Sequence, residues 1–170
     1  ARRGCGGACN STRGVWMGGD NPADQNTIDY IEFASLGDAI DFGDLSTEAG
    51  RRQGHVSSPT RGICGGGFPN ANNIQYIQLM SKGDSIDFGD LTADRVLARG
   101  ESNGLNQRGV MQGGANAVPI GPHSIPDIEY ITISTAGNSL NFGYMRASNY
   151  KNYGGSNDIN ERGVFLDTSD

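Results

Sequence analysis

Closely spaced aspartates are the side chains of this sequence best suited to chemistry, because hard cations such as Ca²⁺ bind several carboxylate oxygens at once. Two sets share one spacing: Asp38, Asp41 and Asp44, then Asp84, Asp87 and Asp90. A third stretch with this spacing reads Asn138, Asn141 and Tyr144. A metal needed for folding should not lose its ligands in one of three copies. Asp and Asn also accept backbone N–H bonds at turns, so we favour capping and expect no cofactor, with Ca²⁺ as the open alternative.

Catalytic motifs are sparse. The two histidines, His55 and His123, stand at non-equivalent places, and no paired Cys/His motif, G-x-S-x-G or metal-ligand spacing occurs. Gly65, Gly66 and Gly67 resemble a phosphate loop only in composition, because no Lys-Ser/Thr follows them. The sequence therefore predicts a protein that is not an enzyme. A glycoside hydrolase with two distant carboxylates stays open as an alternative.

Charge and cysteine content narrow the class further. The net charge of −6 argues against a nucleic-acid surface, which needs an excess of Lys and Arg. Cys5, Cys9 and Cys64 are odd in number and lack a CxxC pair, so we favour buried free thiols over a Cys5–Cys9 bridge. No apolar run approaches the roughly 18 residues of a membrane span, and no signal peptide is visible. The chain begins within a repeat-like segment, so we expect that Ala1 is not its natural start or that the start was processed away.

The elements that carry these residues repeat along the chain. An Arg-Gly motif followed by two apolar or small residues begins at Arg13, Arg61, Arg108 and Arg162, at steps of 48, 47 and 54 residues. In the first three copies it ends in a glycine pair: Gly18 and Gly19, Gly66 and Gly67, Gly113 and Gly114. We expect these pairs at close approaches between strands. The Arg residues should pair with carboxylates or carbonyls at strand ends.

Two further blocks follow each glycine pair. One contains a tyrosine and the other a phenylalanine: Tyr30 and Phe42, Tyr76 and Phe88, Tyr130 and Phe142, always 12 residues apart. We call these segments the Tyr strand and the Phe strand. In the first Tyr strand, Ile28 and Tyr30 point one way and Ile31 and Phe33 the other, which predicts burial on both faces. Between the two strands, a Gly followed by Asp or Asn predicts a hairpin turn.

A fourth strand, rich in Arg and small residues, should precede each Arg-Gly strand. We place it at Arg51 to His55 and Arg99 to Asn103, with Arg2 to Gly6 as its first copy. No helical period appears, so the chain is predicted to be all-β. Four short strands in about 48 residues are typical of a propeller blade.

The glycine pair and the aromatic residues of the next two strands resemble the kelch repeat. Phe42, Phe88 and Phe142 stand where that repeat has a Trp, and the one Trp of this chain, Trp16, lies in a different strand. The resemblance implies a kelch-like β-propeller and covers nearly the whole chain. The full string, from Arg-Gly-Val through Asp-Tyr-Ile to Asp-Phe-Gly-Asp-Leu, also resembles repeat proteins of marine tailed phages, especially those that infect cyanobacteria. That resemblance implies a protein of the virion or its tail.

Counting strands gives 14, which is three and a half blades, whereas closed propellers have roughly four to eight. We expect one β-repeat domain over 1–170, with units of about 1–48, 49–96 and 97–146 and a partial closing unit at 147–170. A three-sheet β-prism-like fold is the alternative. An open array would leave unpaired edges, so we expect assembly with other chains or copies of itself.

Loop lengths suggest where a ligand would bind. The hairpins between Tyr and Phe strands keep one length, while the connections from the glycine pair to the Tyr strand vary, and recognition is commonly carried by loops on a rigid scaffold. The candidate ligand residues on or beside these connections are Asp20, Asn21, Asn26, Phe68, Asn70, Asn72 and His123.

The sequence thus predicts a structural protein of a phage virion, extracellular in the particle, tail- or fibre-associated and bound to other virion proteins. A host surface glycan is the expected small ligand, if there is one. A carbohydrate-binding propeller (lectin) outside a virus is the first alternative, and a propeller glycoside hydrolase is the second. Neither nucleic acid nor membrane insertion is expected.

Overall fold

The computed structural model describes residues 2–46, 49–51, 53–69, 72–103, 108–116, 124–146, 153–156 and 163–166. Within these ranges the regular structure is entirely β-strand, and the predicted all-β class is confirmed. Strands suit this sequence, because short runs rich in Ile, Val, Tyr and Phe alternate with glycine-containing turns.

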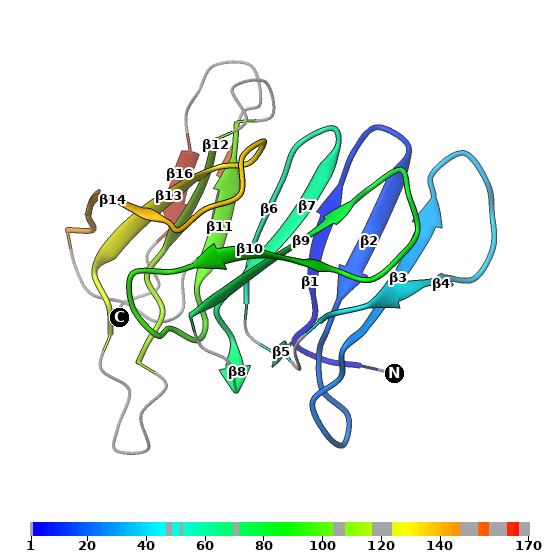
Figure 1. The fold of residues 1–170 in the computed structure, drawn as a ribbon, viewed down its shortest axis with the longest axis horizontal. Helices are drawn as coiled ribbons and strands as arrows, with labels where there is room; N and C mark the ends of the chain where they lie inside the picture. Colours follow the sequence, from blue (N-terminus) through cyan, green and yellow to red (C-terminus); the bar gives the residue numbers. More distant parts are fainter. Residues whose placement is uncertain are drawn as a thin grey trace.

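Three four-stranded antiparallel sheets follow one another along the chain, one for each repeat (Figure 1). Unit 1 contains β1 (Gly6–Cys9), β2 (Arg13–Met17), β3 (Thr27–Glu32) and β4 (Ile40–Asp44). Unit 2 contains β6 (Gly54–Ser57), β7 (Arg61–Gly65), β9 (Asn73–Gln78) and β10 (Ile86–Asp90). Unit 3 contains β11 (Arg99–Ser102), β12 (Arg108–Gln112), β13 (Asp127–Thr132) and β14 (Leu140–Tyr144).

Two smaller sheets complete the described structure. β15 (Tyr153–Ser156) pairs with β16 (Gly163–Leu166), and β5 (Ala49–Arg51) pairs with β8 (Phe68–Pro69). The three large sheets and the β15–β16 pair together hold the 14 strands that the repeat predicts; β5 and β8 were not expected.

The three units pair their strands in one register. Each tyrosine of the Tyr strand lies opposite the apolar residue that follows Arg-Gly: Tyr30 opposite Val15, Tyr76 opposite Ile63, Tyr130 opposite Val110. Such identity of register shows that the repeat in sequence is a repeat in structure.

The predicted position of the first strand was wrong in two of the three units. It lies at Gly6–Cys9 and Gly54–Ser57 and not at Arg2 to Gly6 and Arg51 to His55; only Arg99–Ser102 was placed correctly. The predicted segments each begin at an arginine, whereas the pairing partner sets the register: Gly6 faces Met17 and Gly54 faces Gly65.

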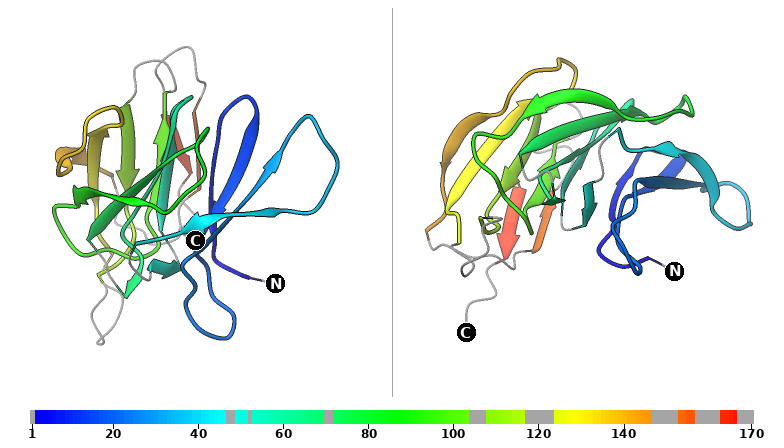
Figure 2. Two further views of the ribbon diagram at one scale, coloured as in Figure 1. Left: turned by 45° about the vertical axis from the view of Figure 1, so that its right-hand side comes forward. Right: turned by 60° about the horizontal axis from the view of Figure 1, so that its bottom comes forward.

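The sheets stack along the long axis of the molecule with unit 2 in the middle (Figure 1). The first strands β1, β6, β11 and β15 contact one another in that order, and we call them the inner strands. The Phe strands β4, β10 and β14 run along the opposite, convex side (Figure 2, right). Buried apolar residues fill the spaces between neighbouring sheets, including Ile28 and Leu79 between units 1 and 2 and Ile74 and Ile133 between units 2 and 3.

Candidate assembly surface

Each unit carries the same aromatic set on its outer strands. The Tyr and Phe rings meet edge to face, with centroids 5.7, 5.9 and 6.1 Å apart in units 1, 2 and 3. The guanidinium of the Arg-Gly strand lies over each tyrosine ring, at 5.0 Å for Arg13, 4.5 Å for Arg61 and 4.7 Å for Arg108. Edge-to-face pairs and cation–π contacts each contribute about 0.5–1.5 kcal/mol, so the set is a stable building block.

The hairpins of units 2 and 3 each bind the Phe strand of the unit before them. Gly83 N–H donates to Phe42 O (2.9 Å) and Ser85 N–H donates to Asp44 O (2.8 Å). In return, Asp44 N–H donates to the Asp84 carboxylate (2.9 Å). The outer edge of β4 is therefore hydrogen-bonded by unit 2.

The next pair of units repeats these three bonds. Gly137 N–H donates to Phe88 O (2.7 Å), Ser139 N–H to Asp90 O (2.9 Å) and Asp90 N–H to Asn138 Oδ1 (3.0 Å). The Asp or Asn after the hairpin glycine thus accepts a bond from the neighbouring unit. Either residue supplies the oxygen, which explains why the third copy can have Asn.

The close approach of the hairpin needs a glycine in the Phe strand. A Cβ on Gly43 would overlap the backbone of Gly83, and one on Gly89 would overlap Gly137. Both glycines also have positive φ, 150° and 145°, which side chains disfavour.

Two side-chain contacts add to this junction. Arg13 donates to Leu79 O (3.0 Å) in the next unit, and Arg61 donates to Ile133 O (2.8 Å). These are bonds of the kind that the sequence predicts for the repeated arginines. They anchor the beginning of each hairpin, just after its Tyr strand.

Polar residues beneath the hairpins add further hydrogen bonds between neighbouring units. Ser46 donates its backbone N–H (2.9 Å) and its hydroxyl (2.8 Å) to buried Gln75 of unit 2. Thr92 makes the same two bonds, 2.9 and 2.7 Å, to buried Glu129 of unit 3.

Glu129 also binds buried Arg95, which balances its charge. Desolvation lowers the pKa of Arg95, and the carboxylates of Glu129 and then Asp127 oppose that shift.

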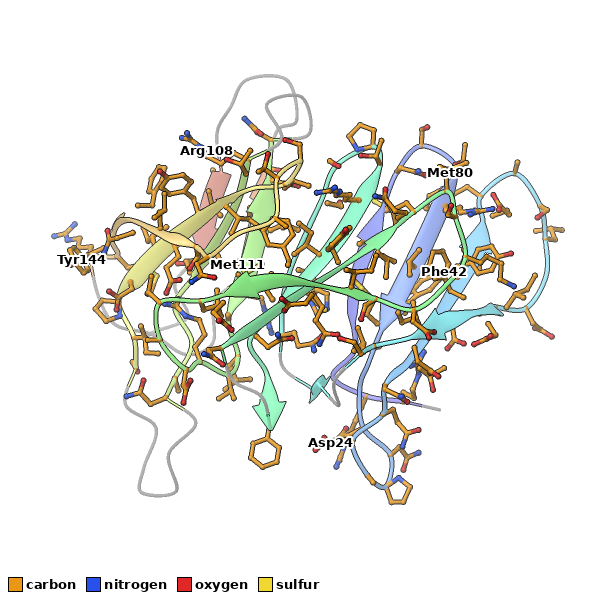
Figure 3. All side chains as sticks on the ribbon, viewed as in Figure 1. Asp24, Phe42, Met80, Arg108, Met111 and Tyr144 are labelled. Carbon is orange, nitrogen blue, oxygen red and sulfur yellow. The ribbon has the colours of Figure 1, made fainter. Side chains whose placement is uncertain are left out.

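The corresponding side of unit 3 is uncovered. Phe42 and Phe88 are each 2% exposed, whereas Phe142 is 55% exposed. Tyr144 is also exposed, and no described residue lies within 4 Å of a Cβ built on Gly143. In Figure 3 Tyr144 projects from the end of the stack, while Phe42 lies among the side chains of units 1 and 2. We call Arg108, Phe142, Gly143 and Tyr144 the unit 3 face.

The opposite end of the stack is uncovered as well, which corrects one expectation. Phe33 is 55% exposed and not buried, although Leu79 and Ile133, at the same place in units 2 and 3, are fully buried. Leu79 is buried by unit 1. No described unit packs against this side of unit 1, so Phe33 is exposed.

The predicted ligand residues differ in exposure and in their contacts. Asp20 is buried and ion-paired with Arg3 (2.9 Å), whereas Asn21 is exposed. Asn26 and Asn72 accept backbone bonds from Leu45 and Leu91, both 2.7 Å.

Phe68 is 42% exposed. Its backbone bridges to the chain before its unit's inner strand, as do those of Asp20 and Ala115. Asn70 and His123 lie outside the described residues.

The glycine pairs lie at the ends of the Arg-Gly strands, and all six glycines are buried. Gly18, Gly66 and Gly113 adopt left-handed φ of 61°, 72° and 62°, and each donates its N–H to the residue that begins the Tyr strand. A Cβ on Gly19 would lie 3.0 Å from Arg3 O. Gly67 N–H donates to Arg95 O (2.9 Å), in the segment that leads from β10 to β11.

A cavity of about 500 Å³ lies where the inner strands begin, and the sequence analysis missed it. Its lining includes His55, Arg99, Gln53 and Cys5 with glycine backbone, but no carboxylate. The His55 ring packs on Gly6, and desolvation lowers the pKa of His55 to about 4, with the Gln53 backbone opposing this shift and Arg99 adding to it. His55 is therefore neutral at pH 7. The feature of the sequence that could have indicated this cavity is a lone histidine in a glycine-rich strand.

Metal-binding groups and membrane-spanning helices are absent from the described ranges, and the three cysteines there are free. No group of three or more His, Cys, Asp or Glu side chains there is placed to hold a metal ion. No helix in them could cross a membrane. Among the three free thiols, Cys64 alone is fully buried; Cys9 is exposed and Cys5 partly so. Burial raises the pKa of Cys64 to about 12.

No family model matches the chain, and no curated protein was found to be similar.

Proposed function

We propose that this protein is a structural component of a multi-chain particle, built from kelch-like β-propeller blades and carrying no catalytic activity. The resemblance of its repeat to proteins of tailed phages suggests a virion, with the chain in a tail or fibre and bound to other virion proteins. The observation that carries the proposal is the unit 3 face, where a contact made twice inside the chain is left open.

The arrangement of the units supports blades over the alternative three-sheet prism. Sheets succeed one another along one axis, and inner strands contact their neighbours in chain order (Figure 1). Units 2 and 3 each bind the unit before them, and units 1 and 2 are each bound by the unit after them. Repeated units of this kind extend by adding further units.

The residues that directly follow the glycine pairs support assembly over sugar recognition. A repeated lectin site would place an exposed aromatic ring beside Asn or Asp in every unit. Asp20, Phe68 and Ala115 occupy the same place in units 1, 2 and 3, and only Phe68 is aromatic.

The test is co-purification. Particles isolated from the native source should contain this chain at a fixed copy number, measured by quantitative mass spectrometry against a known capsid protein. A chain that is found free of particles and agglutinates cells would be a lectin, and the structural proposal would then be wrong.

A further inference from the structure

The β15–β16 pair repeats the inner half of a unit. Its register sets Ser156 opposite Gly163, as Ser102 lies opposite Gly109 in unit 3. β15 packs against β11, and the Ser156 hydroxyl donates to Ser102 O (2.7 Å). The pair therefore occupies the first two strand positions of a fourth unit.

The outer half of that fourth unit is missing from the described chain. In units 1 to 3 the Arg-Gly strand pairs with a Tyr strand on its second edge. β16 has β15 as its one described neighbour. Val164 is 59% exposed, while Val15 and Ile63, at the same register, are 1% and 0% exposed and Val110 of unit 3 is partly buried.

The unit 3 face borders the same vacant place. There Arg108 is exposed, whereas Arg13 and Arg61 are partly buried by their bonds to the next unit. No described residue hydrogen-bonds to the outer edge of β14 as Gly83 does to β4 and Gly137 to β10. The vacancy thus offers two strand edges, those of β16 and β14, together with one aromatic face and one cation.

From this continuity with the two internal junctions, we propose that a Tyr–Phe β-hairpin of the same repeat, carried by a separate polypeptide, docks between β16 and β14. Its Tyr strand pairs with β16, and its turn glycine and the residue two places later donate to Phe142 O and Tyr144 O. The Asp or Asn of its turn accepts from Tyr144 N–H, and the carbonyl after its Tyr strand accepts from Arg108. The inference rests on the proposed assembly function and names the partner.

A second folded copy of this chain does not provide that hairpin. All three of its hairpins are already hydrogen-bonded into their own sheets. A complete unit also carries an inner strand, and β15 occupies the position beside β11 that this strand would need. The partner must therefore present a hairpin that lacks its own first two strands.

The probe is a labelled synthetic peptide of residues 73–91, which contains Tyr76, the Gly83-Asp84 turn and Phe88. Titrated with the 170-residue protein, it should show saturable binding by fluorescence anisotropy. Hydrogen exchange should slow at the Tyr144 amide and in β16, and a peptide with Gly83→Val should bind more weakly. Absence of saturable binding, or protection elsewhere, would overturn the proposal.

A matched pair of variants locates the binding. Phe142→Ser should weaken binding about tenfold or more, because a docked hairpin buries this ring. Phe33→Ser is the control: this ring is equally exposed at the other end of the stack. Equal loss of binding in both variants would contradict the site.

Two further readouts separate the possible occupants. If the protein alone sediments as a dimer that Phe142→Ser dissociates, a second copy fills the vacancy and the separate partner is wrong. Peptide binding by a protein that is not found in particles would leave the docking site standing and defeat the proposed function. If the chain is found in particles but does not bind the peptide, the proposed function stands and the docking site is wrong.

Discussion

The junction between units 1 and 2 and the outer side of unit 3 are built from the same residue types but differ in exposure. Phe42 lies beneath the unit 2 hairpin, while Phe142, in the same ring geometry with its tyrosine, is open to solvent. The edge-to-face pair is therefore formed within each unit, without a neighbour. The neighbour contributes burial and backbone hydrogen bonds, so the cost of a mutation should depend on which side of a junction it strikes.

The largest expected effect is the difference in stability loss between the alanine variants of Phe88 and Phe142. Phe88→Ala should lower the free energy of unfolding by about 3–5 kcal/mol, because a fully buried ring leaves a cavity. Phe142→Ala should cost about 1 kcal/mol or less, since half the ring is already in water. Urea unfolding of both variants makes the measurement; equal losses would mean that unit 3 is covered in solution.

The inner side of the junction should respond to pH through His55. Its folded pKa of about 4 lies below the ordinary value of 6.5, so the unfolded chain binds more protons between these values. Stability should therefore fall as the pH drops from about 6.5 to 4, by up to about 3 kcal/mol. His55→Gln should remove this slope in chemical unfolding measured across that range; an unchanged slope would show that His55 is solvated.

Paired glycine substitutions would isolate crowding from backbone strain. Gly89 and Gly143 have similar positive φ, 145° and 155°, but only Gly89 lies against another unit. Gly89→Ala should therefore destabilise the fold by about 1–3 kcal/mol more than Gly143→Ala. Thermal unfolding of both variants compares them, and identical melting temperatures would contradict the close approach of the hairpin.

The smallest effect should come from the turn residues. Asn138→Ala removes the acceptor of the Asp90 N–H and should cost about 1 kcal/mol. Asp38→Ala at the free end of unit 1 should change stability by about 0.5 kcal/mol or less. Chemical unfolding resolves the difference, and a larger loss for Asp38→Ala would point to a local capping role.

The sequence predicted the all-β class of the fold well, because it depends on local patterns. The fixed distance from Tyr30 to Phe42 and from Tyr76 to Phe88 reflects a hairpin that lies within one unit. The first strand was harder to place, since glycines such as Gly6 and Gly54 give no apolar alternation and their register depends on a partner strand.

The assembly surface could not be predicted from local pattern. Phe142 has the same sequence context as Phe88, and only the presence of a following unit distinguishes their exposure. Likewise, Asp84 resembles an ordinary turn-capping residue, yet its carboxylate accepts from the unit before it. The role of His55 depends on the packing of inner strands that are distant in the chain.

The hairpin contacts also give the stack a direction, with a consequence for how the chain folds as it is made. Unit 2 covers the aromatic face of unit 1, and unit 3 covers that of unit 2; in each case the later segment protects the earlier one. During synthesis from the amino terminus, each emerging unit therefore meets a finished sheet that already presents its ring and its strand edge. On this side of the stack, only the aromatic face of the latest unit is then exposed on the ribosome, which limits the chance that two nascent chains pair through it.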